Sequence, residues 1–449
     1  MYMQLKGAFC GSQCAGDSER GERTPRPDLF GCVHLRKEKE QGQDALATGG
    51  RMKLSVAANY DGELVEKLAG FPVVEVYGKF AADPVGGGRP SYMGTPLTKR
   101  ELTAYVAALQ RHGIAFNYLL NSSCLGNREW SRRWQKKLMR LLEGLGALGI
   151  RRLTISTPYL LERIKAAFPQ FYVKVGIYAQ IDTPRRARFW RDLGADALTL
   201  ESFSINRDFA TLRAIREAVD CELHLIANHP CLPNCPMQPY HQNGFAHSSD
   251  GSRGLFIDYC FLHCTAKRLE DPSMLIKAGW IRPEDIAFYE SLGYEHFKLL
   301  ERGIPSEELL KRVRAYSSRT AGGNLAELIL PYGFSKAPAK QRFWLIRHFL
   351  RPGQVRPWRL KPLYGVLKEQ GMLFALDRNP FRIDSGEIPA DFLQGFEQRR
   401  CSNLACEDCR YCDDIAAKAV TIDPTFREQQ LSRIRQATQS LANGGLWNA

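Results

Sequence analysis

The sequence predicts an α/β protein: a (β/α)8 TIM-like barrel followed by a cysteine-bearing C-terminal domain. Eight short runs of β-branched and aromatic residues alternate with longer amphipathic stretches between Met52 and Tyr316. Alternating strands and helices favour a parallel sheet, and eight such units are the number that closes a barrel. After Tyr316 the pattern changes, and Pro, Lys, Arg and Trp become frequent up to about Lys361. A doubly wound open sheet is the alternative.

The predicted strands share a short apolar run bounded by turn residues. They are Leu54–Asn59, Val73–Tyr77, Ile114–Leu119, Arg152–Ser156, Tyr172–Tyr178, Asp196–Glu201, Glu222–Ala227 and Glu295–Leu300. Helix-start signals fall at Thr98, Pro158, Asp182, Asn206, Pro283 and Ser306, and helix-stop glycines at Gly113, Gly149, Gly194 and Gly293. Beyond the barrel, Asn324–Leu330 is predicted as one more strand, and an amphipathic helix is predicted near residues 424–441.

Three segments are expected: residues 1–51, 52–320 and 321–449. Residues 1–51 are polar and show no sustained period of 2 or 3.6, so we expect a disordered extension or a start codon assigned too early. Cys10, Cys14 and Cys32 lie in this segment, where a Cys-x3-Cys metal site is the minor alternative.

Composition narrows the class of protein. Sixty-two Lys and Arg against 48 Asp and Glu give a net charge of +14, which favours a polyanionic partner such as RNA. No run approaches the roughly 18 apolar residues of a membrane helix, and no secretory signal is recognisable, so a cytoplasmic protein is expected. Thirteen cysteines in 449 residues are too few for a secreted disulfide scaffold and indicate metal ligation or catalysis.

Polar residues follow most of the predicted strands, at the face of a barrel where catalysis occurs. They are Asn59, Tyr77, Asn121 with Cys124, Ser156 with Thr157, Tyr178 with Gln180, Glu201, Asn228 with His229, and Glu301 with Arg302. Together they predict a polar pocket, although each alone is more often a structural cap. The loop Gly86–Tyr92 could bring backbone amides close to an anion, but it is neither a Walker loop nor a dinucleotide fingerprint.

Two Cys-x3-Cys pairs follow the seventh predicted strand: Cys231 with Cys235, and Cys260 with Cys264. Four thiolates suit either zinc or an iron–sulfur cluster. The x3 spacing and the position at a strand end favour the cluster over zinc or unligated cysteines. His229 and His263 are candidates for hydrogen bonds that support the ligands.

A second group packs Cys401, Cys406, Cys409 and Cys412 into twelve residues. Such density indicates a metal, and both a second iron–sulfur cluster and a zinc knuckle remain open. Two other stretches, Arg128–Lys137 and Lys336–Lys361, interleave cations with aromatic rings, as single-stranded nucleic acid requires. A solvated helix face with tryptophans anchored in the core is the alternative for them.

Several motifs together resemble the collagenase-like peptidase family U-thirty-two (U32), over about Met52–Tyr316. They are Leu200–Phe203, the cysteines after the next strand, Asp271–Ile276, Trp280–Asp285 and Phe297–Arg302. The resemblance implies a barrel that binds a 4Fe-4S cluster through four cysteines. It also implies oxygen-independent hydroxylation of RNA bases or quinone precursors, with prephenate as the hydroxyl donor of the RNA enzymes.

By position, Cys260 and Cys264 match the family's second cysteine pair. The first pair is normally wider than Cys231 to Cys235, and the Asn-Arg-Gly that usually precedes the second pair reads Ile257-Asp-Tyr259 here.

We therefore expect an iron–sulfur hydroxylase or related redox enzyme acting on a small polar or quinone-precursor substrate. Its catalytic candidates are Glu201 and Glu301 as acid and base, with Arg302, Asn228 and His229. The alternatives are an RNA base-modifying enzyme of the same family, a peptidase, although no nucleophile with a paired base is visible, and a non-enzymatic zinc or RNA-binding protein. The expected partners are a small-molecule substrate, with RNA as the alternative, and a related family member.

Overall fold

The structure is a computed structural model that describes residues 52–250, 256–300, 302–330, 353–369, 379–399, 401 and 406–447. Two compact units divide the chain, Met1–Gly49 and Gly50–Ala449. The first unit, with Cys10, Cys14 and Cys32, lies outside the described residues. Everything that follows concerns the second unit.

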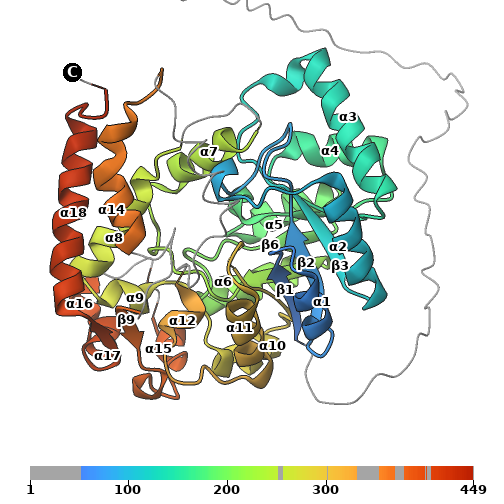
Figure 1. Cartoon of the computed structure of the whole chain (residues 1–449). Coiled ribbons are helices and arrows are strands. Elements are labelled where there is room, and N and C mark those ends of the chain that lie inside the picture. Colours follow the sequence, from blue (N-terminus) through green and yellow to red (C-terminus); the bar gives the residue numbers. More distant parts are fainter. Residues whose placement is uncertain are drawn as a thin grey trace, which may run out of the picture. The chain divides into compact units, whose positions relative to one another are not determined.

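Eight parallel strands close into a barrel in the order β1 to β8, which confirms the predicted fold class (Figure 1). Every predicted strand is present; β1, β4 and β7 are one residue shorter than expected, β5, β6 and β8 are three residues shorter, β3 has the expected length and β2 is one residue longer. They are β1 (Lys53–Ala57), β2 (Val73–Gly78), β3 (Ala115–Leu120), β4 (Arg152–Ile155), β5 (Tyr172–Val175), β6 (Ala197–Thr199), β7 (Glu222–Ile226) and β8 (His296–Lys298). The barrel closes where Lys53 and Leu54 of β1 pair with His296 and Phe297 of β8.

Helices follow the strands and cover the barrel. They are α1 (Gly62–Leu68), α2 (Lys99–Arg111), α3 (Arg132–Ala147), α4 (Pro158–Ala167), α5 (Pro184–Asp192), α6 (Phe209–Ala218) and α11 (Ser306–Ser318). The connection from β7 to β8 is longer and holds α7 (Gln238–Ser248), α8 (Tyr259–Glu270), α9 (Ser273–Lys277) and α10 (Ile286–Ser291).

Local chemistry explains the helix ends. Thr98 and Glu101 form a capping box at the start of α2, which satisfies backbone amides that lack a helical partner. Asn206 does not start α6 as expected. Asp208 is the cap, while the Asn206 amide donates to the carbonyls of Ile226 and Gly279.

Beyond the barrel lie short helices, one long helix and a two-stranded antiparallel sheet. In order they are α12 (Ala326–Ile329), α14 (Lys361–Glu369), β9 (Phe381–Ile383), α15 (Gln394–Glu397), α16 (Cys406–Cys409), α17 (Tyr411–Ala419), β10 (Val420–Ile422) and α18 (Pro424–Ala442). The expected helix near residues 424–441 is α18, which packs along α14 and α8 (Figure 1). Arg282 ties this region to the barrel, since its guanidinium donates to the carbonyls of Ile388 and Pro389.

The predicted strand Asn324–Leu330 is wrong. Asn324 makes a single antiparallel bridge to Asp384, and the residues after it form α12. The Asn324 side chain accepts hydrogen bonds from the amides of Ala326 and Ile383, and such a side chain starts a turn in place of a ladder. Every helix within the described residues is too short or too polar to traverse a lipid bilayer.

Candidate functional site

The four barrel cysteines come from two segments after β7. Cys231 and Cys235 lie half-buried in the loop that follows the strand, and Cys260 and Cys264 lie one turn apart on α8. Residues four apart on a helix share a face, so the second pair presents both sulfurs to the same side. Asp258 caps α8 by accepting from the amide of Phe261, which fixes where the helix begins.

Electrostatics shows that the four thiols are neighbours. Burial raises the pKa of Cys231 to about 12; Arg268 opposes this, and the Cys264 and Cys235 thiols reinforce it. Burial raises the pKa of Cys260 to about 12 as well, with Asp258, Cys235 and Cys264 adding to it. Each thiol therefore lies within the field of at least two others.

Arg268 holds the two segments together. Its Nη1 donates to Sγ of Cys264 at 3.4 Å, and its Nη2 donates to the carbonyl of Pro230 at 2.6 Å, next to Cys231. Burial raises the pKa of Cys231 and Cys264, and the buried Arg268 cation opposes this rise and so favours the anionic forms that bind metals. The residues present therefore fit a metal–thiolate centre.

Four cysteines fit either tetrahedral zinc or an iron–sulfur cluster, because both take thiolate ligands.

A small pocket opens at the ends of β1, β2 and β8. Its walls include Tyr60, Lys79, Arg89 and Arg302, so three cations face one small volume. Lys79 is buried and lies 3.0 Å from Asp83, and Arg89 Nη1 donates to the carbonyl of Arg302. Such a pocket suits an anionic group.

Tyr178 contacts the loop that carries Arg89, since its phenol donates to the carbonyl of Gly88 at 3.5 Å. Burial raises the pKa of this phenol; Arg302 and Arg89 lower it, and Cys231 raises it.

The loop that carries Arg89 is fixed by its glycines, but not in the way the sequence suggested. The amides of Gly86, Gly87 and Gly88 donate to Asp83, Ser249 and Asn121, so they are not available to an anion. Gly86 has a positive φ of 85°, and a Cβ there would lie 2.6 Å from the Ala246 carbonyl.

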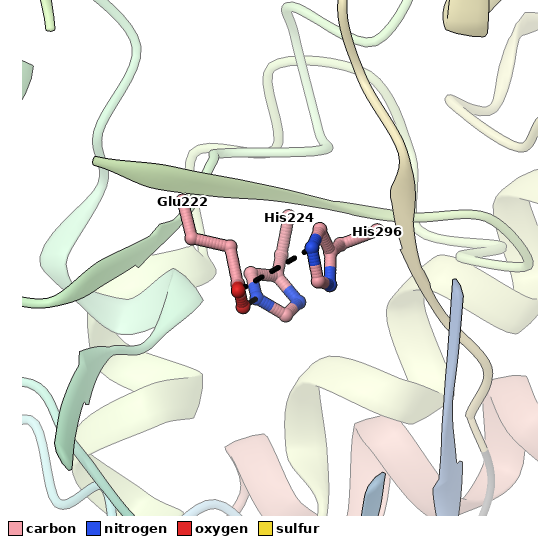
Figure 2. A group of neighbouring side chains, drawn as sticks. All are labelled: Glu222, His224 and His296. Carbon is pink, nitrogen blue, oxygen red and sulfur yellow. Dashed lines mark hydrogen bonds and ion pairs between the residues drawn. The ribbon is translucent and has the colours of Figure 1, made fainter. Parts of the chain in front are cut away.

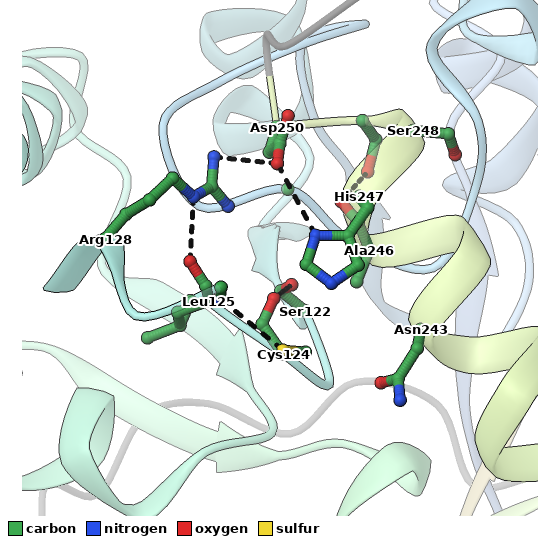
Figure 3. A network of polar contacts seen from close by, with 12 residues as sticks. Ser122, Cys124, Leu125, Arg128, Asn243, Ala246, His247, Ser248 and Asp250 are labelled. Atoms are coloured by element: carbon green, nitrogen blue, oxygen red, sulfur yellow. Dashed lines mark hydrogen bonds and ion pairs between the residues drawn. The ribbon is translucent and has the colours of Figure 1, made fainter. Parts of the chain in front are cut away.

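A polar network around Asp250 packs against the same loop (Figure 3). Its carboxylate lies 2.7 Å from Arg128 Nη1 and 3.9 Å from His247 Nδ1. Arg128 Nε also donates to the carbonyl of Leu125. The network joins the end of α7 to the loop after β3, which contains Cys124.

The predicted catalytic residues divide into several environments. Arg302 lines the pocket, as expected of a functional residue. Glu301 lies outside the described residues. The Glu201 carboxylate accepts hydrogen bonds from the amides of Phe203 and Ser204 and from the Ser204 hydroxyl, so it fixes the conformation of the loop that follows it.

Asn228 and His229 have structural partners. The Asn228 side chain donates to the carbonyls of Leu300 and Leu328 and accepts from the amide of Leu300, so it aligns the end of β8. His229 Nδ1 lies 2.7 Å from Ser202 Oγ. This pair is a serine beside a base that the sequence did not reveal, but Ser202 is fully buried and cannot meet a peptide substrate.

The sequence analysis did not find Arg89, Lys79 or Arg268, and it named Tyr178 only as a residue at the end of a strand. Arg268 follows Cys264 by four residues, and that spacing on a helix was the available signal. Arg89 and Arg302 are 213 residues apart and meet only because β2 and β8 both flank β1.

A second cluster of metal-ligating side chains, Glu222, His224 and His296, has its ligand atoms within 4.8 Å of one another (Figure 2). His224 Nε2 lies 2.5 Å from the Glu222 carboxylate, and its Nδ1 lies 3.3 Å from Lys174 Nζ. Because an ammonium can only donate, Nδ1 accepts and the ring proton is on Nε2. A metal on Nε2 would place that proton on Nδ1, facing the ammonium, so the cluster is a hydrogen-bonded ion network.

This network lies at the beginnings of β7 and β8, away from the face where barrel enzymes carry out catalysis. Lys174 continues it to the Glu75 carboxylate at 2.8 Å, and Glu75 also accepts from Ser55 and Asn117. The network provides hydrogen-bond and ion-pair partners for the polar side chains buried inside the barrel.

The fold and the site define a parallel-barrel protein with four cysteines after β7 and a pocket at the ends of β1, β2 and β8. The chain is 31% identical over 248 residues to the uncharacterized protease MJ1657 of Methanocaldococcus jannaschii, a match that covers 54% of this chain and 74% of the relative. It belongs to peptidase family U32.

No family model matches the chain. Among solved structures, it resembles the U32 peptidase Mk0906 with a TM-score of 0.44 and 20% identity, over 60% of this chain and all of that one. It also resembles a 3-hexulose-6-phosphate synthase with a TM-score of 0.31 and 15% identity, over 60% of this chain and all of the synthase.

Proposed function

We propose that the protein is an iron–sulfur enzyme, an oxygen-independent hydroxylase that acts on a small anionic substrate or donor at the barrel mouth. Cys231, Cys235, Cys260 and Cys264 would hold a 4Fe-4S cluster, which supplies one-electron chemistry when bound. The observation that carries this proposal is the convergence of the two cysteine segments on Arg268, which donates to Sγ of Cys264 and to the Pro230 carbonyl next to Cys231.

The chain's own residues perform binding and orientation. Arg89 and Arg302 would bind a carboxylate through charge-assisted hydrogen bonds. The Tyr178 hydroxyl, which donates to the Gly88 carbonyl, would help to hold the loop that carries Arg89.

Lys298 is the group best suited to move a proton. Burial lowers its pKa to about 7, and Lys174 lowers it further while Glu75 opposes the shift. Its ammonium lies over the Tyr77 ring, 3.9 Å from the centroid, at the end of β8. A group with a pKa near 7 can both accept and donate a proton at neutral pH, whereas Glu201 has its oxygens occupied.

Anaerobic purification followed by iron, sulfide and zinc analysis tests the proposal. Cys260→Ser with Cys264→Ser should remove the barrel cluster, and Cys124→Ser with Cys221→Ser is the matched control, since neither of these cysteines belongs to a quartet. Unchanged iron and sulfide in the first variant would refute the assignment. A wild-type protein with stoichiometric zinc and no sulfide would do the same.

A second candidate is RNA base modification, favoured by one surface. Trp130 is 69% exposed, and Arg132, Arg133 and Lys136 are exposed beside it at the start of α3. Trp134 of the same stretch is a core residue, its indole donating to the carbonyl of Pro84. In the second basic stretch, residues 336–352 lie outside the described part, and Trp358 is 69% exposed. Exposed rings beside cations are what a single strand requires.

A further inference from the structure

The second cysteine quartet also converges in space, although it lies outside the barrel. Cys406 and Cys409 lie at the two ends of the single-turn helix α16, and Cys412 is the second residue of α17. Burial raises the pKa of Cys412 to about 11, and the Cys401 and Cys406 thiols add to it while Arg207 opposes it. Cys401 in turn lies in the fields of Cys406 and Cys409.

Arg207 is the charge that faces this quartet. It is only 8% exposed, and its guanidinium donates to the carbonyls of Ile276 and Trp280 at 2.6 and 2.9 Å. The Trp280, Phe392 and Phe396 rings surround it, with centroids 4.3 to 5.0 Å away. Its Nε is buried with no hydrogen-bond partner among the described residues.

No carboxylate in the described part of the chain pairs with this buried cation. Asp285 is the acid whose field reaches Arg207, but its two oxygens lie 2.8 and 2.9 Å from the Arg282 guanidinium. A buried guanidinium without a counter-charge is unfavourable. The other groups acting on Arg207 are Tyr289, whose hydroxyl donates to the Asn206 carbonyl and is therefore neutral, and the cysteines Cys412 and Cys401.

We propose that Cys401, Cys406, Cys409 and Cys412 hold a second iron–sulfur cluster, whose negative charge balances the buried Arg207. The spacing selects the cluster: Cys-x4-Cys-x2-Cys followed by x2-Cys is the close spacing of ferredoxin-type ligands, whereas structural zinc usually takes two separated pairs.

This centre would fasten the C-terminal region to the barrel. Trp280, in the β7–β8 connection, stacks on Phe392, and Phe392 stacks on Tyr411, the neighbour of Cys412. Lys277 of α9 pairs with Asp413 at 3.3 Å. The cluster would therefore lie at the join between the two regions, independently of the cysteines on α8.

The test compares two quartet variants of the full chain, purified anaerobically: Cys406→Ser with Cys409→Ser, and Cys260→Ser with Cys264→Ser. Each should lose about half of the wild-type iron and sulfide, while Cys124→Ser with Cys221→Ser loses none. If the barrel proposal alone fails, all of the iron disappears in the first variant and none in the second. Wild-type iron and sulfide in the first variant would overturn the second cluster.

Two further measurements cover the case in which the first variant does not fold. Iron and sulfide that remain in Cys260→Ser with Cys264→Ser support the second cluster, whereas zinc without sulfide overturns it. Arg207→Met keeps all ligands but removes the counter-charge, so the reduction potential of one cluster should become more negative, with Arg207→Lys close to wild type. Identical potentials in the wild type and Arg207→Met would contradict the pairing of Arg207 with the cluster.

Discussion

Arg268 and Cys264 lie one turn apart on α8, and Nη1 of the arginine donates to the sulfur of the cysteine at 3.4 Å. The same guanidinium reaches the Pro230 carbonyl beside Cys231. One side chain therefore touches both segments of the barrel quartet and supplies its positive charge.

Replacing Arg268 with Met should weaken metal binding at the barrel. Arg268 lowers the pKa of Cys231 and Cys264, so its removal makes proton binding compete more strongly with metal binding. We expect less iron per chain and faster bleaching in air, measured by absorbance and iron analysis. Arg268→Lys keeps the charge but not the two-pronged guanidinium, so its iron content should lie between those of the wild type and Arg268→Met. Equal iron content in all three proteins would contradict this role.

Replacing Arg89 or Arg302 with Met should impair binding of an anionic ligand in the pocket. Loss of one charge-assisted hydrogen bond weakens binding by about tenfold to a hundredfold. Calorimetric titration with prephenate measures the effect, and Arg186→Met, an exposed surface change paired with Asp182, is the control. Equal affinity in the wild type and both pocket variants would show that the anion binds elsewhere.

Acid should destabilise the protein through the Glu222 network. Burial and Lys174 lower the pKa of His224 to about 4. Between about pH 6.5 and pH 4 this histidine is therefore protonated in the unfolded chain but neutral in the folded chain. Stability is therefore lost as pH falls from 6.5 towards 4, by about 2 kcal/mol at pH 5.

Glu222 acts in the same direction at lower pH. Burial opposes its ionisation, but His224 and His296 outweigh burial and lower its pKa to about 2, so its contribution is lost below about pH 4.5. Denaturant unfolding at pH 7.5 and 5.0 measures how the free energy of unfolding changes with pH. His224→Gln should reduce this change, and the surface variant His112→Gln should not. A change in His224→Gln as large as in the wild type would contradict the role of His224.

The surface at the start of α3 distinguishes RNA from small-molecule chemistry. If RNA binds there, Arg132→Glu with Arg133→Glu and Lys136→Glu should abolish binding, and Trp130→Ala should weaken it. The log–log salt slope should also become shallower in the charge variants, because each phosphate contact releases close to one counterion. A matched reversal on α2, at Lys99, Arg100 and Arg111, is the control, and parallel losses in both sets would indicate non-specific attraction.

The barrel could be predicted from the sequence because its signals are local. The strand Val73–Tyr77 is indicated by its own apolar and β-branched residues, and the spacing of the cysteines is read directly from the sequence. A polar pocket with Arg302 could be predicted, but not the presence of Arg89 in its wall, because the two arginines come from distant segments that only the closure of the barrel brings together. The burial of Arg207 could not be predicted either, because Trp280 and Phe392 are distant in the sequence. Asn324 misled the strand prediction because its side chain competes with backbone pairing.

The last long helix has a consequence for how the protein matures. Arg427 of α18 donates to the carbonyl of Glu270 at the end of α8, and Arg435 pairs with the Glu270 carboxylate at 3.2 Å. The helix that carries Cys260 and Cys264 is thus braced by residues synthesised more than 150 positions later. A ribosome must release almost the whole described chain before α8 gains this support, so loading of the α8 cysteines is expected to follow translation.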